Sequence, residues 1–382
     1  KRPSLFIFWI IALICIGPLF AFYANFPLAG RFALGTFERF LLPSYVLLAP
    51  LVGIGVVALA QTLAMSIRRA LHGISVAGVS SLIFVIMLLY PLTVGSMNIW
   101  RFWGMRTDQT AEHLGMDILA SAPEGAIVLL VHDTSLFVTQ YLRYATRMRT
   151  DTTVVHVAKI AFPDYREVLA HMPGGPLVPK EEGSVAITEF IKANRMERPI
   201  VSNSTLPLDD GWAWIPHGML YLLAETTQED VSEMYVAANE SLWQTLHDPY
   251  AGILSRYKHL MLSNVLDEYA QASINYGDAL LRIGKQKDAL SVYSRAVGYG
   301  SDGKNYTALM RLGVTQALVN DCSGALSSLD AASEQVNTDS SEVLLYRAAI
   351  YRDCVGDAAR AQKLFEQYET VKKQSETPLE RL

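Results

Sequence analysis

A histidine and an aspartate follow a short, wholly apolar run of the chain. Ala126–Val131 (AIVLLV) has the composition of a buried strand and leads directly into His132 and Asp133. A helix is expected next, from Ser135 to Ala145. Ligands of open α/β sheets bind beyond the carboxyl ends of strands, so His132 and Asp133 form a candidate polar site. The alternative is that Asp133 or one of the next two residues only caps the helix by accepting backbone N–H groups.

The other histidines and glycines form no recognisable cofactor or metal motif. No GxGxxG follows a strand and no GxxxxGK[ST] occurs, so the sequence predicts neither a dinucleotide site nor a P-loop. HExxH and CxxC spacings are absent as well, which leaves surface or packing roles for His113, His156, His171 and His217. We therefore expect no cofactor and no metal.

Helices and buried strands alternate in the part of the chain that contains His132. In order, the expected elements are a helix at Thr110–Ser121, a strand at Ala126–Val131, a helix at Ser135–Ala145, a strand at Thr153–Ala158, a helix at Ser184–Asn194 and a strand at Pro199–Ser202. This alternation predicts a small α/β domain with a parallel sheet. We place this domain at residues 101–250.

The N-terminal part, residues 1–100, contains three long apolar runs without an ionisable side chain. They are Ser4–Tyr23, Ser44–Ala64 and Val76–Ser96, and each has the roughly 20 residues that a helix needs to cross a bilayer. We predict three transmembrane α-helices, although the first run could instead be a signal peptide. A transporter is disfavoured, because the runs carry no charged group that could line a pathway.

Basic residues at the ends of these runs predict the orientation of the chain. Lys1 and Arg2 precede the first run, and Arg68 and Arg69 follow the second, so these ends should face the cytoplasm. We expect an integral membrane protein of a bacterial inner membrane whose part after Ser96 is extracytoplasmic. The net charge of −5 and the pI of about 5.9 indicate no basic field, so nucleic acid is not an expected partner.

Three segments near the C-terminus align with a period of 36 residues. Gly277, Gly313 and Ala349 occupy one position (313 − 277 and 349 − 313). Two further positions are equivalent, one held by Ala289, Ala325 and Ala361 and one by Tyr293, Leu329 and Phe365. The pattern resembles the tetratricopeptide repeat, whose period is about 34, and predicts an all-α solenoid at residues 251–382. Its face is expected to bind a peptide or protein partner, or else to brace the α/β domain or a dimer partner.

Two cysteines lie at related places in this repeat array. Cys322 falls in the inter-helix turn of the second repeat, and Cys354 falls near the same turn of the third. Neighbouring repeats bring such turns together, and an exported domain meets oxidising conditions. We therefore predict a disulfide between Cys322 and Cys354.

Several short motifs between Thr36 and Leu223 form a recognisable set. They are Glu38–Ser44 (ERFLLPS), Asp108–Glu112 (DQTAE), Asp133 after the first strand, the pair Tyr141-Leu142, Arg149-x-Asp151, and Pro216-x-Gly218 within Ile215–Tyr221. The set resembles a multi-span membrane family long known as a domain of unknown function, which is similar to protein O-mannosyltransferases of the GT-C type. His132 departs from the resemblance, because the family more often has glycine before the aspartate.

This resemblance implies a catalytic carboxylate in the first outer loop and a sugar donor carried on polyprenyl phosphate. The chain offers no acid for that loop, since Glu38 matches a late segment of the family instead. We therefore expect the chain to be the C-terminal portion of a longer protein. Its catalytic half would lie upstream of Lys1, and the chain alone should be inactive.

The resemblance also supplies the remaining candidate site residues. Arg39, and with it Arg31, is expected at the outer membrane interface beside Glu38, where a guanidinium could hold a lipid-linked phosphate. The alternative is that Arg39 extends to the membrane surface or pairs with Glu38. In the α/β domain the candidate residues are His132, Asp133, Arg149, Asp151 and His217.

These observations leave two functions from different classes. The leading hypothesis is a portion of a membrane glycosyltransferase-like protein that transfers a sugar from a polyprenyl-phosphate carrier to an exported protein. The competing hypothesis is a membrane-anchored interaction module without catalysis, in which the repeats recruit a partner.

Overall fold

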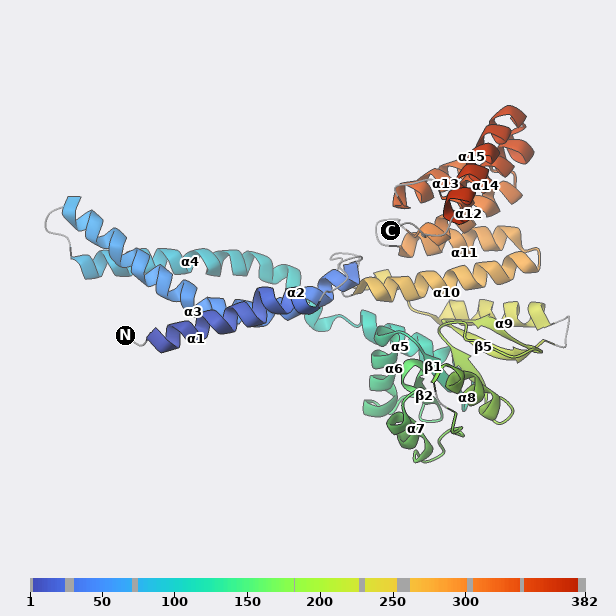
Figure 1. Ribbon diagram of the computed structural model, residues 1–382, viewed down its shortest axis with the longest axis horizontal. Coiled ribbons are helices and arrows are strands. Elements are labelled where there is room, and N and C mark those ends of the chain that lie inside the picture. The colour runs from blue at the N-terminus through green and yellow to red at the C-terminus, as the bar shows by residue number, and fades with distance from the viewer. Residues whose placement is uncertain are drawn as a thin grey trace. The chain divides into compact units, whose positions relative to one another are not determined.

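The computed structural model describes residues 3–24, 31–70, 75–181, 183–226, 231–252, 262–300, 305–336 and 340–376. These residues fall into two units, one of Lys1–Asp108 with Gly252–Ser263 and one of Gln109–Ala251 with Asn264–Leu382. The first unit contains the predicted membrane part. The second contains both the α/β part and the helical array, and Figure 1 labels the elements of each.

The first unit consists of long apolar helices. Its elements are α1 (Pro3–Ile14), a π-helical turn at Cys15–Leu19, α2 (Phe20–Ala24), α3 (Arg31–Ala70), α4 (Val76–Trp103) and a 3₁₀ turn at Gly104–Thr107. Large apolar side chains on α3 and α4 point outward, as Val46, Ile54 and Ile86 do with more than half of their surface exposed. Such an exposed apolar surface suits lipid rather than water.

Two of these helices are long and apolar enough to cross a membrane. The stretches are Phe37–Ile67 in α3 and Ala77–Ile99 in α4, whereas the first predicted run gives only a shorter apolar stretch, Ile7–Tyr23. Pro18 lies in the π-helical turn between α1 and α2. A proline removes one backbone donor and disturbs the hydrogen-bond ladder of a helix, which accounts for the π-helical turn within this run.

The α/β part of the second unit has the predicted helices and strands in the predicted order, together with one helix that was not predicted and two further strands at its end. Its helices are α5 (Thr110–Ala120), α6 (Asp133–Gln140) with a π-helical turn at Tyr141–Ala145, α7 (Pro163–Ala170) and α8 (Ala186–Asn194). Its strands are β1 (Ile127–Leu130), β2 (Thr153–His156), β3 (Ile200–Ser202), β4 (Trp212–His217) and β5 (Leu220–Glu225).

The sheet is mixed, so the prediction of a parallel sheet was only partly right. The strand order is β2-β1-β3-β5-β4, with β1 parallel to both β2 and β3. Strand β5 is antiparallel to both β3 and β4. The three predicted strands form the parallel half, and the antiparallel half comes from a hairpin that the sequence reading did not include.

Gly218 explains why β4 and β5 form a hairpin. It has a φ of +62° in the two-residue connection between the strands, a conformation that glycine adopts without steric cost. A Cβ at this position would also clash with the side chain of Ser121. The Pro216-x-Gly218 motif is therefore the turn of a hairpin, which Asn239 fastens by accepting from the Gly218 N–H at 2.6 Å.

The core of the α/β part lies between the sheet and its helices. Ile127 and Leu129 of β1, Val155 of β2 and Ile200 of β3 are buried together with Phe190 of α8. Strand β1 is completely buried because it lies between β2 and β3, which accounts for its uninterrupted apolar sequence.

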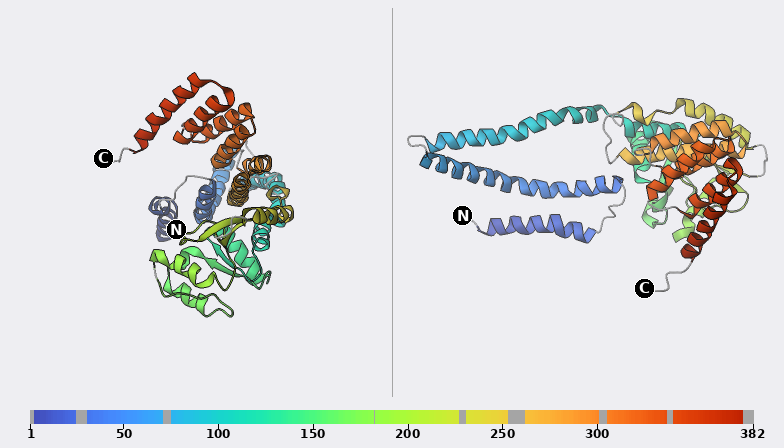
Figure 2. Two further views of the ribbon diagram at one scale, coloured as in Figure 1. Left: turned by 90° about the vertical axis from the view of Figure 1, so that its right-hand side faces the viewer. Right: turned by 90° about the horizontal axis from the view of Figure 1, so that it is seen from above.

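The helical array follows α9 (Val231–Thr245). It consists of α10 (Ser263–Arg282), α11 (Gln286–Tyr299), α12 (Tyr306–Leu318), α13 (Cys322–Val336), α14 (Ser341–Ile350) with a π-helical turn at Tyr351–Val355, and α15 (Ala358–Glu376). Helix α12 packs on α11 and α13, and α14 packs on α13 and α15. Figure 2 shows these helices following one another from light orange to red.

Small residues allow the paired helices to approach closely at the predicted positions. A Cβ on Gly277 of α10 would lie 2.6 Å from the ring of Tyr293 on α11. One period later, a Cβ on Gly313 would meet the backbone of Ala325 and the side chain of Leu329. The 36-residue spacing thus corresponds to repeated helix pairs with the same contact.

Cys322 and Cys354 form a disulfide with a Cα–Cα distance of 5.7 Å. Cys322 begins α13, and Cys354 lies in the turn between α14 and α15. The bond therefore joins the second helix pair to the third.

Candidate functional site

A largely buried carboxylate, that of Glu268, connects the helical array to the edge of the sheet where β1 ends. Glu268 of α10 lies with its Oε1 2.7 Å from His132 Nδ1 and accepts from the Ser135 hydroxyl at 2.8 Å. Its side chain is 11% exposed, whereas that of His132 is 58% exposed. Strand β1 positions the histidine, which lies two residues after the strand ends at Leu130 and is the N-cap of α6.

Asn203 completes this cluster from the neighbouring strand. It follows β3 directly and accepts from the Val131 N–H at 2.9 Å through Oδ1. Its amide nitrogen donates to the Ser135 hydroxyl at 3.2 Å. The cluster of His132, Ser135, Asn203 and Glu268 therefore lies at the carboxyl ends of two parallel strands, the edge at which α/β sheets bind ligands.

The charge of Glu268 sets the electrostatics of the cluster. Its hydrogen bond to His132 raises the pKa of the imidazole, although partial burial of the ring opposes the change. Ser135 donates to the carboxylate rather than to the imidazole, so the arrangement differs from that of a nucleophilic serine activated by histidine. The cluster can hold a proton at His132, and it ties α10 to the sheet.

Asp133 lies beside the cluster, and its predicted capping role was wrong. His132 occupies the N-cap position of α6, and no side-chain cap hydrogen bond forms at this described helix end. Asp133 is instead an exposed residue in the first helical turn, where a carboxylate interacts favourably with the helix dipole. Its charge also raises the pKa of His132 to a small extent.

Arg149 and Asp151 lie before β2, at the opposite edge of the sheet from His132. Arg149 makes a forked contact to Asp151, with distances of 3.0 and 2.8 Å, while Asp151 accepts from the Gly125 N–H ahead of β1. The same guanidinium donates to the carbonyls of Leu119 and Ala122 at 2.6 and 2.8 Å. These contacts hold the pKa of Asp151 far below its usual range and fasten the end of α5.

His217 is also separate from the cluster. It ends β4, which runs in the same direction as β3, but β5 lies between these two strands and separates His217 from the strand end that carries Asn203. Burial lowers the pKa of His217, and within the described residues its buried Nδ1 has no hydrogen-bond partner. The five candidates of the α/β part therefore do not form one site.

The membrane candidates belong to the other unit. Arg31 begins α3, and its side chain lies outside the described residues; Glu38 and Arg39 follow on the same helix with exposed side chains. Among the described residues neither Glu38 nor Arg39 makes an ion pair. Arg39 is therefore an exposed cation within the first turn of the apolar stretch Phe37–Ile67.

Sequence reasoning missed three members of the cluster. Asn203 follows β3 as His132 follows β1, so the same strand-end rule could have identified it. Ser135 was considered only as a helix cap. Glu268 had no local signal, because it is 136 residues from His132 and reaches the cluster only through the docking of α10.

The fold and its surfaces define a class of protein: a membrane-associated chain that carries a mixed α/β part and a helical array. No protein-family model matches it. The chain is similar to the protein O-mannosyl-transferase TMEM260 of Mus musculus, with 26% identity over 176 residues. The match covers 46% of this chain but only 24% of that relative, so the chain spans about a quarter of its length. The similarity supports a glycosyltransferase-like relationship.

Proposed function

We propose that this chain forms part of a membrane protein O-mannosyltransferase-like enzyme, which transfers a sugar from a polyprenyl-phosphate carrier to an exported protein. The observation that carries the proposal is the match to a protein O-mannosyl-transferase. Two helices long and apolar enough to span a bilayer give independent support, because a lipid-linked donor must be bound at a membrane.

In this proposal the transfer chemistry depends on polypeptide additional to the present chain. The match covers only 24% of the relative. Arg149 of the α/β part and Glu268 of the helical array, two well-connected polar groups, are engaged in holding elements together. The chain would contribute the outer cover of an active site rather than its catalytic carboxylate.

Arg39 is our candidate contact to the donor. It is an exposed guanidinium at the start of the apolar stretch Phe37–Ile67, and a forked guanidinium matches the geometry of a phosphate. Glu38 precedes it, and Arg31 lies about two helical turns before it on α3. The part after α4 would be extracytoplasmic, where exported acceptors are available.

The helical array would hold the acceptor. Its period of 36 residues and the close contact of Gly277 with Tyr293 support a tetratricopeptide-like array. Arrays of this kind present an extended surface to peptides and proteins.

A membrane-anchored interaction module without catalysis is the second candidate. It is favoured by the hydrogen bond from Ser135 to Glu268. Ser135 carries the hydroxyl of the cluster, and this hydroxyl contacts the array instead of being available as a nucleophile. In this alternative the helices α3 and α4 anchor the chain, and the array recruits a partner.

Deletion of the gene in its source cells distinguishes the two functions. The transferase proposal predicts that exported proteins lose an O-linked hexose, detected by mass spectrometry of their peptides, and regain it on complementation with the intact gene. Unchanged O-linked sugars combined with loss of a co-purifying membrane partner would favour the interaction module.

A further inference from the structure

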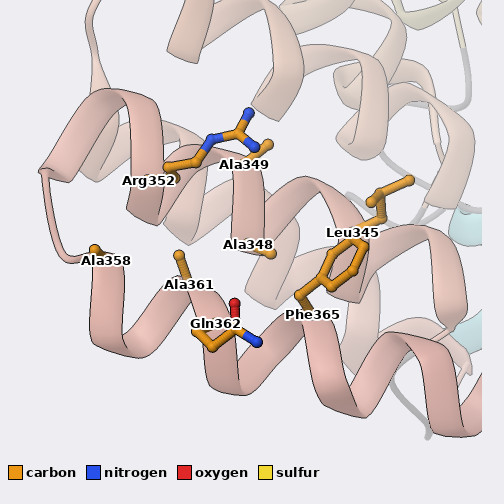
Figure 3. Close-up of a pocket in the computed structure, with 8 residues that line it drawn as sticks. All are labelled: Leu345, Ala348, Ala349, Arg352, Ala358, Ala361, Gln362 and Phe365. Carbon is orange, nitrogen blue, oxygen red and sulfur yellow. The ribbon is translucent and has the colours of Figure 1, made fainter.

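The last helix pair of the array carries an open groove. It lies between α14 and α15 and has a volume of about 400 Å³. Figure 3 shows side chains of the two helices facing each other across it. The lining residues are Leu345, Ala348, Ala349 and Arg352 from α14 and the turn after it, and Ala358, Ala361, Gln362 and Phe365 from α15.

Comparison of the three helix pairs shows which surface of the last pair forms this groove. Phe365 is equivalent to Leu329 of the second pair and Tyr293 of the first, at intervals of 36 residues. Tyr293 and Leu329 are completely buried, whereas Phe365 is 44% exposed. The groove is therefore the copy of a surface that is covered in both earlier pairs.

A helix covers this surface in each earlier pair. On the first pair, Ala308 of α12 is buried in one cluster with Tyr293, and Leu312 packs against the same cluster. On the second pair, Val343 and Ile350 of α14 are buried with Leu329. The covering helices have 13 and 10 residues, and each begins at a polar N-cap whose side chain accepts a backbone hydrogen bond.

The shape and chemistry of the groove fit another such helix. On α14 and on α15, the lining residues are spaced at i, i+3, i+4 and i+7, which forms one continuous stripe on each helix. Alanine dominates the lining, so a helix backbone can approach closely between the two stripes. Arg352 forms its ion pair with the adjacent Asp353, which leaves the groove without a net charge to select a charged ligand.

We propose that this groove binds an amphipathic α-helix of another polypeptide, seated as α12 is seated on the first pair. The occupant would present small and apolar side chains on one face, at the spacing of Ala308 and Leu312. The inference rests on the helical array alone and is independent of the transferase proposal.

A peptide copied from the chain itself is the probe for this site. The full chain in lipid nanodiscs is titrated against a fluorescent peptide of residues 305–319, stapled on its solvent face to stabilise the helix, and binding is read as anisotropy. The control peptide has Ala308→Asp and Leu312→Asp. We expect saturable binding of the first peptide and at least tenfold weaker binding of the second.

Two chain variants locate the binding. Leu345→Ser removes an apolar lining side chain, and Gln362→Trp fills the groove from an exposed position without removing buried surface. Each should weaken binding about tenfold with unchanged far-UV circular dichroism. The matched control is Leu318→Ser, an exposed leucine of α12 outside the groove, which should bind as the wild type does.

Three outcomes would overturn the proposal. One is binding no stronger than that of the control peptide, and another is binding that Leu345→Ser and Gln362→Trp leave unchanged. The third is a dimer of the wild-type chain that Gln362→Trp dissociates and that an excess of the peptide leaves intact. That result would assign the groove to a second copy of this chain.

Discussion

The buried hydroxyl of Ser135 donates to Glu268 at 2.8 Å, although the two residues are 133 positions apart in the sequence. The same carboxylate oxygen contacts His132. Glu268 therefore serves two groups of the α/β part from a helix of the array. This contact joins two parts of the chain. One is the edge of the sheet where α/β proteins bind ligands, and the other is the helical array that we propose holds a protein partner.

Replacement of Glu268 by alanine should destabilise the second unit. The Ser135 hydroxyl would be left without its acceptor in a buried position, which costs about 1–3 kcal/mol. Thermal unfolding followed by circular dichroism measures the loss. Glu167→Ala is the control, because Glu167 is an exposed acid on α7, and an equal effect of the two substitutions would contradict the assigned role of Glu268.

The pair of His132 and Glu268 predicts a pH dependence of stability. Because Glu268 raises the pKa of His132 in the folded state, the stabilisation is fully present below the unfolded pKa of 6.5 and is lost as the pH rises through the higher folded value. The exposure of His132 limits the effect to about 1 kcal/mol or less. Urea unfolding of the wild type and His132→Asn should differ more at pH 5.5 than at pH 8.5. A difference that grows toward pH 8.5 would contradict the sign.

Arg149→Ala should be destabilising because Arg149 is a structural clamp. Its loss would remove donors from the carbonyls of Leu119 and Ala122, at a cost of about 1–3 kcal/mol. Arg352→Ala is a matched control, since Arg352 makes the same forked contact to Asp353 on an exposed surface, where an ion pair contributes about 0–1 kcal/mol. Equal changes in the free energy of unfolding would argue against the clamp.

Loss of the disulfide should loosen the last two helix pairs. The bond closes a separation of 32 residues, and removal of such a bond typically costs about 2–4 kcal/mol. Intact-mass analysis after alkylation, with and without reductant, tests for the bond, and thermal unfolding of Cys322→Ser/Cys354→Ser measures its contribution. Two freely alkylated thiols at these positions in unreduced protein would disprove it.

Much of the fold could be predicted because its signals are local. The apolar runs without charged residues predict the membrane-spanning stretches of α3 and α4. The uninterrupted apolar run at β1 predicts a strand that is buried in the middle of a sheet. The period of 36 residues likewise exposes the repeated contact of Gly277 with Tyr293. In each case residues close in sequence determine the element.

The rest depended on contacts between distant parts of the chain. The hairpin of β4 and β5 was missed, although Gly218 marks its turn, because β4 carries Pro216 and alternates only weakly between buried and exposed residues. Glu268 could not be assigned to a site, because only the docking of α10 brings it to His132. Arg149 and His132 were grouped as candidates, yet they lie at opposite edges of the sheet.

Our central proposal is that this chain forms part of a membrane O-mannosyltransferase-like enzyme and that Arg39 contacts the sugar donor. The most direct test is the intact mass of an exported acceptor protein after incubation with polyprenyl-phosphate mannose and the complete gene product in nanodiscs. The proposal predicts a mass increase of one or more hexoses, strongly reduced by Arg39→Ala and unaffected by Arg69→Ala at the other end of α3. No hexose transfer by the complete gene product would contradict the claim, and equal transfer by both variants would contradict the role of Arg39.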